Sequence, residues 1–313
     1  MSLPAHLTAP VLWTVAAVVA ALALATALAA WRRARDPEGA RELWLRVRSW
    51  WVMVAVFAVA VLLGPRASIV FLAFVSYLAL KEYLSLIPTR RADRRVLFWA
   101  YLAIPVQYWW VADAWYGMFV IFIPVYMFLL LPARMVLAGE TRGFLRAAGT
   151  LHWGLMSTVF ALSHAAYLLA LPPEGNPVGG RAGLLLYLVL LTELNDVAQY
   201  VWGRLLGRRP VVPRVSPRKT VEGLAGGVAT TVALAVLLAP WLTPLAPLEA
   251  LGAGLLIGLG GFAGDVTLSA VKRDIGVKDS GTLIPGHGGV LDRVDSLTYS
   301  APLFFHYVVY LHY

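Results

Sequence analysis

The chain has 313 residues, of which 60% are hydrophobic, 14% are charged and none is cysteine. Its mean hydropathy of +0.72 is far above what a soluble domain needs to fill a core, so the lipid bilayer is the expected solvent. Without cysteine there is no disulfide, no thiolate metal site and no cysteine nucleophile. The formal charge of +9 does not indicate nucleic-acid binding, because the basic residues are scattered among short loops between apolar segments.

Apolar segments recur along the whole chain, and they predict an all-α polytopic integral membrane protein with about nine or ten transmembrane helices. A helix of about 20 apolar residues crosses the hydrocarbon core and bonds its own backbone groups there. The segments lack the two-residue alternation of membrane β-barrel strands. The predicted spans are residues 9–31, 49–64, 67–87, 96–112, 115–133, 150–171, 182–203, 221–243, 248–270 and 296–312.

Lys and Arg residues concentrate in alternate loops, and this asymmetry predicts how the chain crosses the membrane. Only Arg66 and Arg181 fall in loops on the other side. We therefore expect an integral protein of a bacterial inner membrane with both termini outside the cytoplasm. The basic loops, which would face the cytoplasm, are residues 32–48, 88–95, 134–149, 204–220 and 271–295.

Charge composition changes after residue 190, which divides the chain into N-terminal transmembrane helices, residues 1–180, and a C-terminal catalytic transmembrane region, residues 181–313. Glu193 and Asp196 lie three residues apart on one face of the seventh span. Ionisable groups at membrane depth are costly and indicate function by default. We favour a functional role for Asp196, whereas Glu193 is equally compatible with a span end that reaches water.

Lys81 and Glu82 stand near the end of the third predicted span. Long charged side chains at such positions commonly extend to the membrane surface while their stems stay in apolar surroundings. We therefore expect both residues to lie at the membrane interface rather than to line a site.

The basic loop 204–220 carries six cations and no acidic residue. Membrane topology alone explains most of them. The segment Ser216-Pro217-Arg218-Lys219-Thr220 is more specific, because proline restricts the backbone and a hydroxyl stands at the predicted start of the next helix. We expect this segment to bind a phosphate near the positive end of that helix, through Ser216, Lys219 and Thr220.

The densest polar stretch runs from Ser269 to Ser296, directly after Asp265. Its carboxylates suit Mg²⁺, which takes oxygen ligands and bridges to phosphates, and its cations suit a polyphosphate. Glycines beside a histidine let the backbone approach phosphate closely. These residues alone predict metal-assisted phosphoryl or nucleotidyl transfer at the cytoplasmic face. The candidates are Ser269, Lys272, Arg273, Lys278, Asp279, His287, Gly288, Gly289, Asp292, Arg293 and Asp295.

The same stretch resembles the signature of the phosphatidate cytidylyltransferase (CDP-diacylglycerol synthase) family. It has Ser-x-x-Lys-Arg, then Lys-Asp, Pro-Gly-His-Gly-Gly and Asp-Arg-x-Asp in register. Upstream, the segment 216–223 is similar to the family's Ser-Pro-x-Lys-Thr-x-Glu-Gly, and Gly264-Asp265 to its Gly-Asp pair. The first 180 residues match only in being hydrophobic spans.

The resemblance implies that phosphatidate attacks the α-phosphorus of CTP, which gives CDP-diacylglycerol and pyrophosphate. It implies that Asp265 and Asp292 bind Mg²⁺, with room for a second cation, and that Asp196 and Asp295 are supporting carboxylates. His287 is expected to position a ligand or shape the loop rather than to act as a general base. The residues implied to bind triphosphate or lipid phosphate are Lys219, Lys272, Arg273, Lys278 and Arg293, of which Lys272 and Arg273 join the catalytic set of Asp196, Asp265 and Asp292.

Two positions depart from the family pattern: Gln199 stands where Ala is usual, and Leu268 stands where Glu usually precedes the motif serine. They indicate a divergent branch, and they leave open another lipid phosphate acceptor or a non-catalytic lipid-binding paralogue. A third alternative is an ion-coupled transporter, but we detect no inverted repeat. The central aspartates, which a non-catalytic paralogue would have lost, are all present. Small residues in the span 248–270 would also permit a homodimer.

Overall fold

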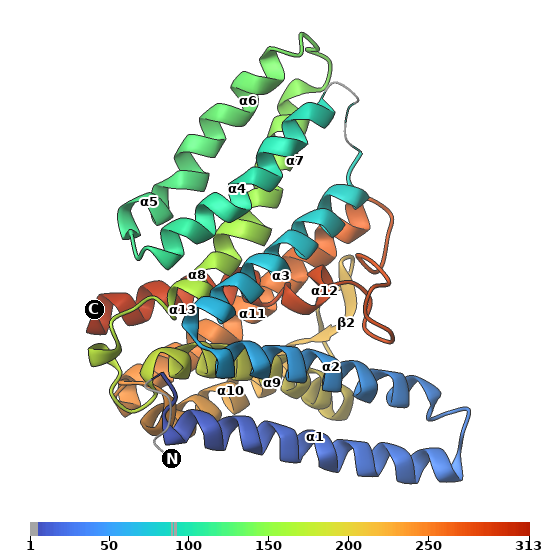
Figure 1. The fold of residues 1–313 in the computed structure, drawn as a ribbon. Coiled ribbons are helices and arrows are strands. Elements are labelled where there is room, and N and C mark those ends of the chain that lie inside the picture. Colours follow the sequence, from blue (N-terminus) through green and yellow to red (C-terminus); the bar gives the residue numbers. More distant parts are fainter. Residues whose placement is uncertain (1–5, 89, 91–92) are drawn as a thin grey trace.

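The computed structural model describes residues 6–88, 90 and 93–313, which form helices joined by short loops (Figure 1). The elements are α1 (Ala9–Arg35), α2 (Arg41–Leu63), α3 (Pro65–Leu86), α4 (Arg94–Ala112), α5 (Tyr116–Ile121), η2 (Phe122–Met127), α6 (Phe128–Val136), α7 (Phe144–Leu155), η3 (Met156–Phe160), α8 (Ala161–Tyr167), η4 (Pro173–Gly175), α9 (Gly180–Leu206), β1 (Pro210–Val212), β2 (Ser216–Thr220), α10 (Val221–Leu242), α11 (Pro247–Asp274), α12 (Leu291–Val294) and α13 (Leu297–His312).

The all-α membrane architecture is confirmed. In the described part of the chain, seven helices are long and apolar enough to cross a membrane: α1, α2, α3, the unit Tyr116–Val136, α9, α10 and α11. The remaining predicted spans also fall on helices, namely α4, the unit α7–η3–α8, and α13. The unit 116–136 widens to a π-helix at η2, which contains Pro124. Proline lacks the N–H that a regular helix needs, so a local change of hydrogen bonding is expected there.

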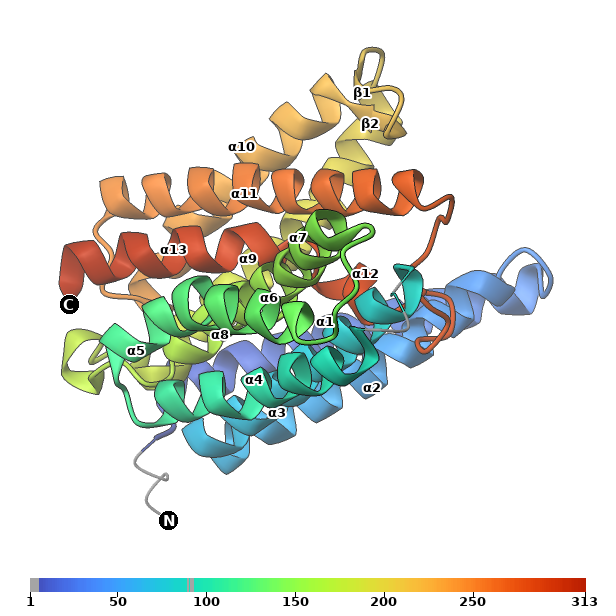
Figure 2. The same cartoon turned by 90° about the horizontal axis from the view of Figure 1, so that it is seen from above.

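The C-terminal helices pack closely because α11 is rich in glycine. It contacts α9, α10 and α13, and α11 lies alongside α13 (Figure 2). A Cβ on Gly254 would meet the backbone of Val232 in α10, and one on Gly264 would collide with the carbonyl oxygen of Asp295. These small residues therefore serve packing inside the chain. The homodimer expected from them remains an untested prediction.

The polar connections gather toward one end of the helices. The β1–β2 hairpin, the turn between α1 and α2, and the segment between α11 and α12 lie toward that end, whereas α13 ends toward the opposite one (Figures 1 and 2). This arrangement agrees with the alternation of basic loops, while the orientation in the membrane stays a prediction. Arg91, one of the basic residues of the loop 88–95, lies outside the described residues.

Within the basic loop 204–220, the last turn of α9 extends to Leu206, and residues 210–220 form a small antiparallel hairpin in which Pro210 pairs with Thr220 and Val212 with Ser216. Thr220 then begins α10, as predicted, and its hydroxyl oxygen accepts a hydrogen bond from the N–H of Gly223 at 3.1 Å. Such a cap satisfies one of the free N–H groups at a helix start. The hairpin fixes the direction in which Lys219 leaves the backbone.

Candidate active site

One face of α11 carries three of the predicted site residues. Asp265, Ser269 and Lys272 follow each other at intervals of four and three residues, so they lie on the same side of the helix. Gly264 lets the segment around Asp295 approach this face without a steric clash. The helix thus presents a carboxylate, a hydroxyl and an ammonium group toward the hairpin and the loop that precedes α13.

The first lysine–aspartate pair joins the hairpin to α11. The ammonium group of Lys219 donates a hydrogen bond to Asp265 Oδ2, and the Ser269 hydroxyl donates to Asp265 Oδ1 at 3.2 Å. Lys219 also stands 5.0 Å above the ring of Phe262. The two charged side chains keep 20% and 25% of their surface exposed, so a ligand can reach both.

The second pair, Lys272 and Asp292, is more enclosed. Lys272 Nζ donates to Asp292 Oδ1 at 2.7 Å, and Oδ2 accepts from the backbone N–H groups of Ser280 and Gly289 at 2.8 and 2.9 Å. Burial raises the pKa of Asp292, but the hydrogen bonds from Lys272, Gly289 and Ser280 outweigh it and hold this pKa below its ordinary value. Asp292 is therefore a carboxylate, and it organises the loop that precedes it.

Two further carboxylates, those of Asp196 and Asp295, are joined through Ser296 and connect α9 with the start of α13. Ser296 donates from its hydroxyl to Asp196 Oδ2 and from its backbone N–H to Asp295 Oδ1, both at 2.8 Å. Burial, followed by the negative charges of Asp265 and Asp196, raises the pKa of Asp295 well above its ordinary value. Asp196, Asp265 and Asp295 thus lie close enough to interact electrically, and we call them the carboxylate cluster.

The residues predicted to bind Mg²⁺ are carboxylates that already have lysine partners. Within residues 6–88, 90 and 93–313, no three carboxylate or histidine side chains converge closely enough to hold a metal ion alone. Both proposed ligands, Asp265 and Asp292, are paired with a lysine. Mg²⁺ in phosphate-transfer sites commonly takes only one or two protein carboxylates together with substrate phosphates. The donor set fits that kind of site, and it does not form a dedicated metal cage.

Several predicted residues lie beside these pairs rather than in them. Arg273 donates to the carbonyl oxygens of Val215 and Val277 at 3.3 and 3.1 Å, so it joins the hairpin to the turn after α11. Lys278 and Asp279 are exposed. Ser216 pairs with Val212 at the start of β2.

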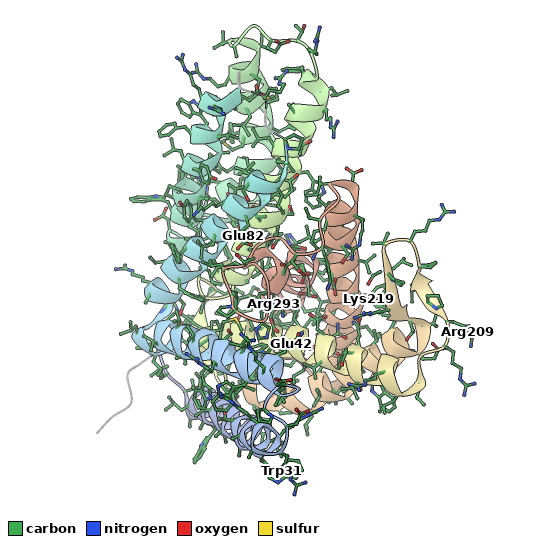
Figure 3. The ribbon with its side chains drawn as sticks, turned by 90° about the vertical axis from the view of Figure 1, so that its right-hand side faces the viewer. Trp31, Glu42, Glu82, Arg209, Lys219 and Arg293 are labelled. Carbon is green, nitrogen blue, oxygen red and sulfur yellow. The ribbon has the colours of Figure 1, made fainter. Side chains whose placement is uncertain are left out.

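Among the described residues, Arg293 Nε and His287 Nδ1 are buried and have no hydrogen-bond partner. Burial lowers the pKa of His287, so its imidazole is neutral at pH 7. The His287 and Trp50 rings are nearly perpendicular, and their centroids are 6.0 Å apart. Gly288 has a φ of +84°, which glycine adopts without strain. Figure 3 shows Arg293 and Lys219 in the middle part of the molecule, whereas Arg209 points outward at its edge.

The N-terminal helices contribute residues that the sequence motifs do not reveal. Glu82, at the end of α3, accepts hydrogen bonds from the Ser280 hydroxyl and from the N–H groups of Val290 and Leu291. Glu82 was expected at the membrane interface rather than in a site, and the second part of this expectation is wrong, because its carboxylate is bound by the loop before α12 and by the first residue of α12. Ser49 on α2 donates to the carbonyl oxygen of Pro285 at 2.7 Å. The sequence signal that could have revealed Glu82 was an acidic residue at the end of an apolar span.

The two departures from the family pattern lie in packed surroundings. Leu268 is 3% exposed and belongs to the hydrophobic core. Gln199 packs against Gly227 of α10, and its amide nitrogen is buried without a partner. Directly before Ser269, where the family pattern has a carboxylate, this chain therefore has an apolar side chain that packs in the core.

A cavity of about 940 Å³ opens beside the site, between the ends of α3 and α11 and the start of α7. Its described walls include Trp153, Arg142, Arg146, Val271 and Asp274. None of the predicted site residues lines it. The cavity is therefore a separate feature from the lysine–aspartate pairs.

Comparison with known proteins gives the family. The model of the cytidylyltransferase family matches residues 44–311. "Uncharacterized protein YnbB" of Escherichia coli (strain K12) is 49% identical over 299 residues, which cover 95% of this chain and 98% of that protein. A phosphatidate cytidylyltransferase of Synechocystis sp. is 45% identical over 141 residues, covering 44% of this chain and 47% of that protein. The phosphatidate cytidylyltransferase of Staphylococcus haemolyticus is 29% identical over 269 residues, covering 83% and 97%. This chain therefore belongs to the cytidylyltransferase family.

Proposed function

We propose that this membrane protein converts CTP and phosphatidate to CDP-diacylglycerol and pyrophosphate. A phosphate oxygen of the lipid forms a bond to the α-phosphorus of CTP, and the bond from that phosphorus to the bridging oxygen of the β-phosphate breaks. The observation that carries the proposal is the hydrogen bond by which Lys219 of the hairpin is joined to Asp265 on the polar face of α11. The family match and the named relatives support the same reaction class.

The lysines are suited to bind phosphate. Lys219 and Lys272 each contact a carboxylate and keep part of their surface exposed, so each can exchange or share its partner when a phosphate arrives. Arg293 can donate from its unpartnered Nε. Positive groups held in place stabilise the charge that builds up on departing pyrophosphate. The nucleophile is a substrate oxygen, so the protein needs no nucleophilic side chain of its own.

We further propose that Asp265 and Asp292 hold Mg²⁺, with Asp295 and Asp196 in support. When bound, the ion would neutralise triphosphate charge and polarise the reacting phosphoryl group. Asp265 is the more accessible ligand, since its side chain is 25% exposed, against 6% for Asp292. Asp292 contributes a charge that is fixed in place by its loop.

The proposed setting is the cytoplasmic side of a bacterial inner membrane. CTP would enter from the cytosol, where the basic loops are expected to lie, and the lipid would enter from the bilayer. The apolar helices around the site support this division, because they keep the lipid in hydrocarbon while its phosphate reaches the polar end of the bundle.

The test is turnover of radiolabelled CTP with phosphatidate and Mg²⁺ in detergent micelles. Wild type is compared with Asp265→Asn and Asp292→Asn. We expect labelled CDP-diacylglycerol from wild type and none above background from either variant. A folded wild type that binds CTP but leaves phosphatidate unreacted would refute the proposed acceptor.

A second acceptor is the alternative that one observation favours. Leu268 places an apolar side chain where the family pattern has a carboxylate, directly before Ser269. A changed charge at this point can alter which lipid phosphate is accepted. The same assay with other lipid phosphates in place of phosphatidate decides between the two substrates.

A further inference from the structure

Glu82 binds the catalytic region through three separate donors. Its Oε2 accepts from the Ser280 hydroxyl at 3.1 Å and from the Leu291 N–H at 2.8 Å, while Oε1 accepts from the Val290 N–H at 2.9 Å. Figure 3 labels Glu82 and Arg293 in the middle part of the molecule. Val290 and Leu291, whose N–H groups contact Glu82 at the start of α12, are 208 and 209 residues from it along the chain.

The contacts fall at the start of α12, the single helical turn that carries Asp292 and Arg293. The first N–H groups of a helix have no partner within the helix, and a carboxylate there stabilises the helix start. Glu82 supplies this cap from another helix. It therefore determines where α12 begins, and with it the direction of the Asp292 side chain.

Ser280 links Glu82 to Asp292 directly. Its hydroxyl donates to Glu82, and its backbone N–H donates to Asp292 Oδ2. Gly289 fits between them, because a Cβ there would collide with Glu82 Oε2 and with the Ser280 hydroxyl. The loop 275–290, which we call the motif loop, is thus held toward both of its ends, at Ser280 and at Val290, by one N-terminal carboxylate.

We propose that Glu82 is a positioning residue that fixes the motif loop and α12, so that Asp292 stands ready to serve the phosphate and metal chemistry. This inference rests on the proposed function, which it extends to the N-terminal helices. Glu82 itself contacts no reacting group. It acts through Ser280 and the backbone of α12.

The test compares Glu82→Gln with Glu42→Gln. Glutamine keeps the size of the side chain, but its NH₂ group must face at least one of the three donors. Glu42 is a matched control, since it lies on α2 and, in the part of the chain that the structure describes, pairs with Arg46 of its own helix alone. Glu82→Asp keeps the charge and both acceptor oxygens, and we expect it to recover part of the loss.

The first readout is hydrogen exchange in the full-length protein in detergent, which needs no activity. We expect about tenfold faster exchange across residues 280–292 in Glu82→Gln, with unchanged exchange in α9 and α10. Glu42→Gln should exchange like wild type. Equal exchange of this segment in wild type and Glu82→Gln would overturn the proposal.

The second readout is the Mg²⁺ concentration that gives half-maximal turnover. Loss of a residue that orients a metal ligand commonly weakens metal binding by about tenfold or more, whereas a smaller folded fraction leaves this concentration unchanged. We expect an increase on the order of tenfold in Glu82→Gln and none in Glu42→Gln. An unchanged value in an active Glu82→Gln would count against a positioning role.

Ser280→Ala gives an independent check where Glu82→Gln folds poorly. It removes one contact to Glu82 and leaves the backbone bond to Asp292 in place. We expect a smaller change in the same direction, and a double variant whose effect is less than the product of the single effects. Multiplicative effects would show that the two residues act separately. A folded wild type without cytidylyl transfer refutes the proposed function, while the exchange experiment still decides the role of Glu82.

Discussion

The two lysine–aspartate pairs of the site differ in what surrounds them. Lys219 and Asp265 are partly exposed, and Asp265 has one further donor, Ser269. Asp292 is enclosed and accepts from Lys272 and from two backbone N–H groups of the motif loop. The first pair is available to a ligand, whereas the second also organises the protein. The two aspartates, Asp265 and Asp292, therefore have different roles although they are the same residue type.

The largest expected effect is on turnover. Asp265→Asn removes the accessible carboxylate of the cluster, and we expect kcat to fall on the order of a thousandfold, since the loss of a ligand to the proposed Mg²⁺ removes stabilisation of the charge on the transferring phosphoryl group. Its melting temperature should stay close to that of wild type, because the side chain is partly solvated. Turnover and thermal unfolding in the same detergent measure both. Retained activity would remove Asp265 from the catalytic set.

Asp292→Asn should lose activity and stability together. Removing one partner of a buried ion pair leaves the other charge uncompensated, which costs about 3 kcal/mol. We therefore expect a clear fall in melting temperature that Asp265→Asn does not show. Equal melting temperatures in the two variants would break the contrast between the pairs.

Substitutions of lysine residues test the same comparison, with smaller expected effects on turnover. Lys219→Gln should lower kcat/KM for CTP by about a hundredfold, because it removes a positioned cation from the cluster. Lys81→Gln is the matched substitution on an exposed lysine of α3 outside the candidate set, and we expect at most a few-fold change, as for exposed charges in general. Steady-state kinetics at varied CTP concentrations test this order, which a larger loss in Lys81→Gln would reverse.

Gly289→Ala tests the packing of the second pair. The added methyl group would collide with Glu82 and Ser280, and forced overpacking costs about 2 kcal/mol. Gly149→Ala on α7 meets nothing within 4 Å and is the control. Thermal unfolding should separate the two variants. A stable Gly289→Ala protein would show that the motif loop can shift without harm.

Thr220→Ala should have the smallest effect. It removes the cap of α10, which costs about 1 kcal/mol of stability, and loosens the backbone that carries Lys219. Thr14→Ala serves as a control, since within the described residues the Thr14 hydroxyl donates just to a carbonyl oxygen of its own helix. Thermal unfolding of the two variants measures the difference, and equal values would show that the cap contributes nothing.

The sequence by itself determined the helical membrane architecture, because hydrocarbon imposes helices on any long apolar segment. It also indicated that Asp265 and Ser269 share a helix face, since their spacing of four residues follows from the helical repeat. Lys272 was predicted in the loop after this span, and the structure places it on the same face because α11 continues to Asp274. Thr220 was predicted at a helix start for the same local reason. These features depend on neighbours within a few residues of each other along the chain.

Only the tertiary structure decided which charges meet. Lys219 is 46 residues from Asp265, and Glu82 is 198 residues from Ser280, so no local pattern could pair them. Glu82 was predicted outside the site because long charged side chains at the end of an apolar span commonly extend to the membrane surface. Here Ser280 and Val290 of the motif loop and Leu291 of α12 supply three donors at that point, and these hydrogen bonds hold the carboxylate against the loop.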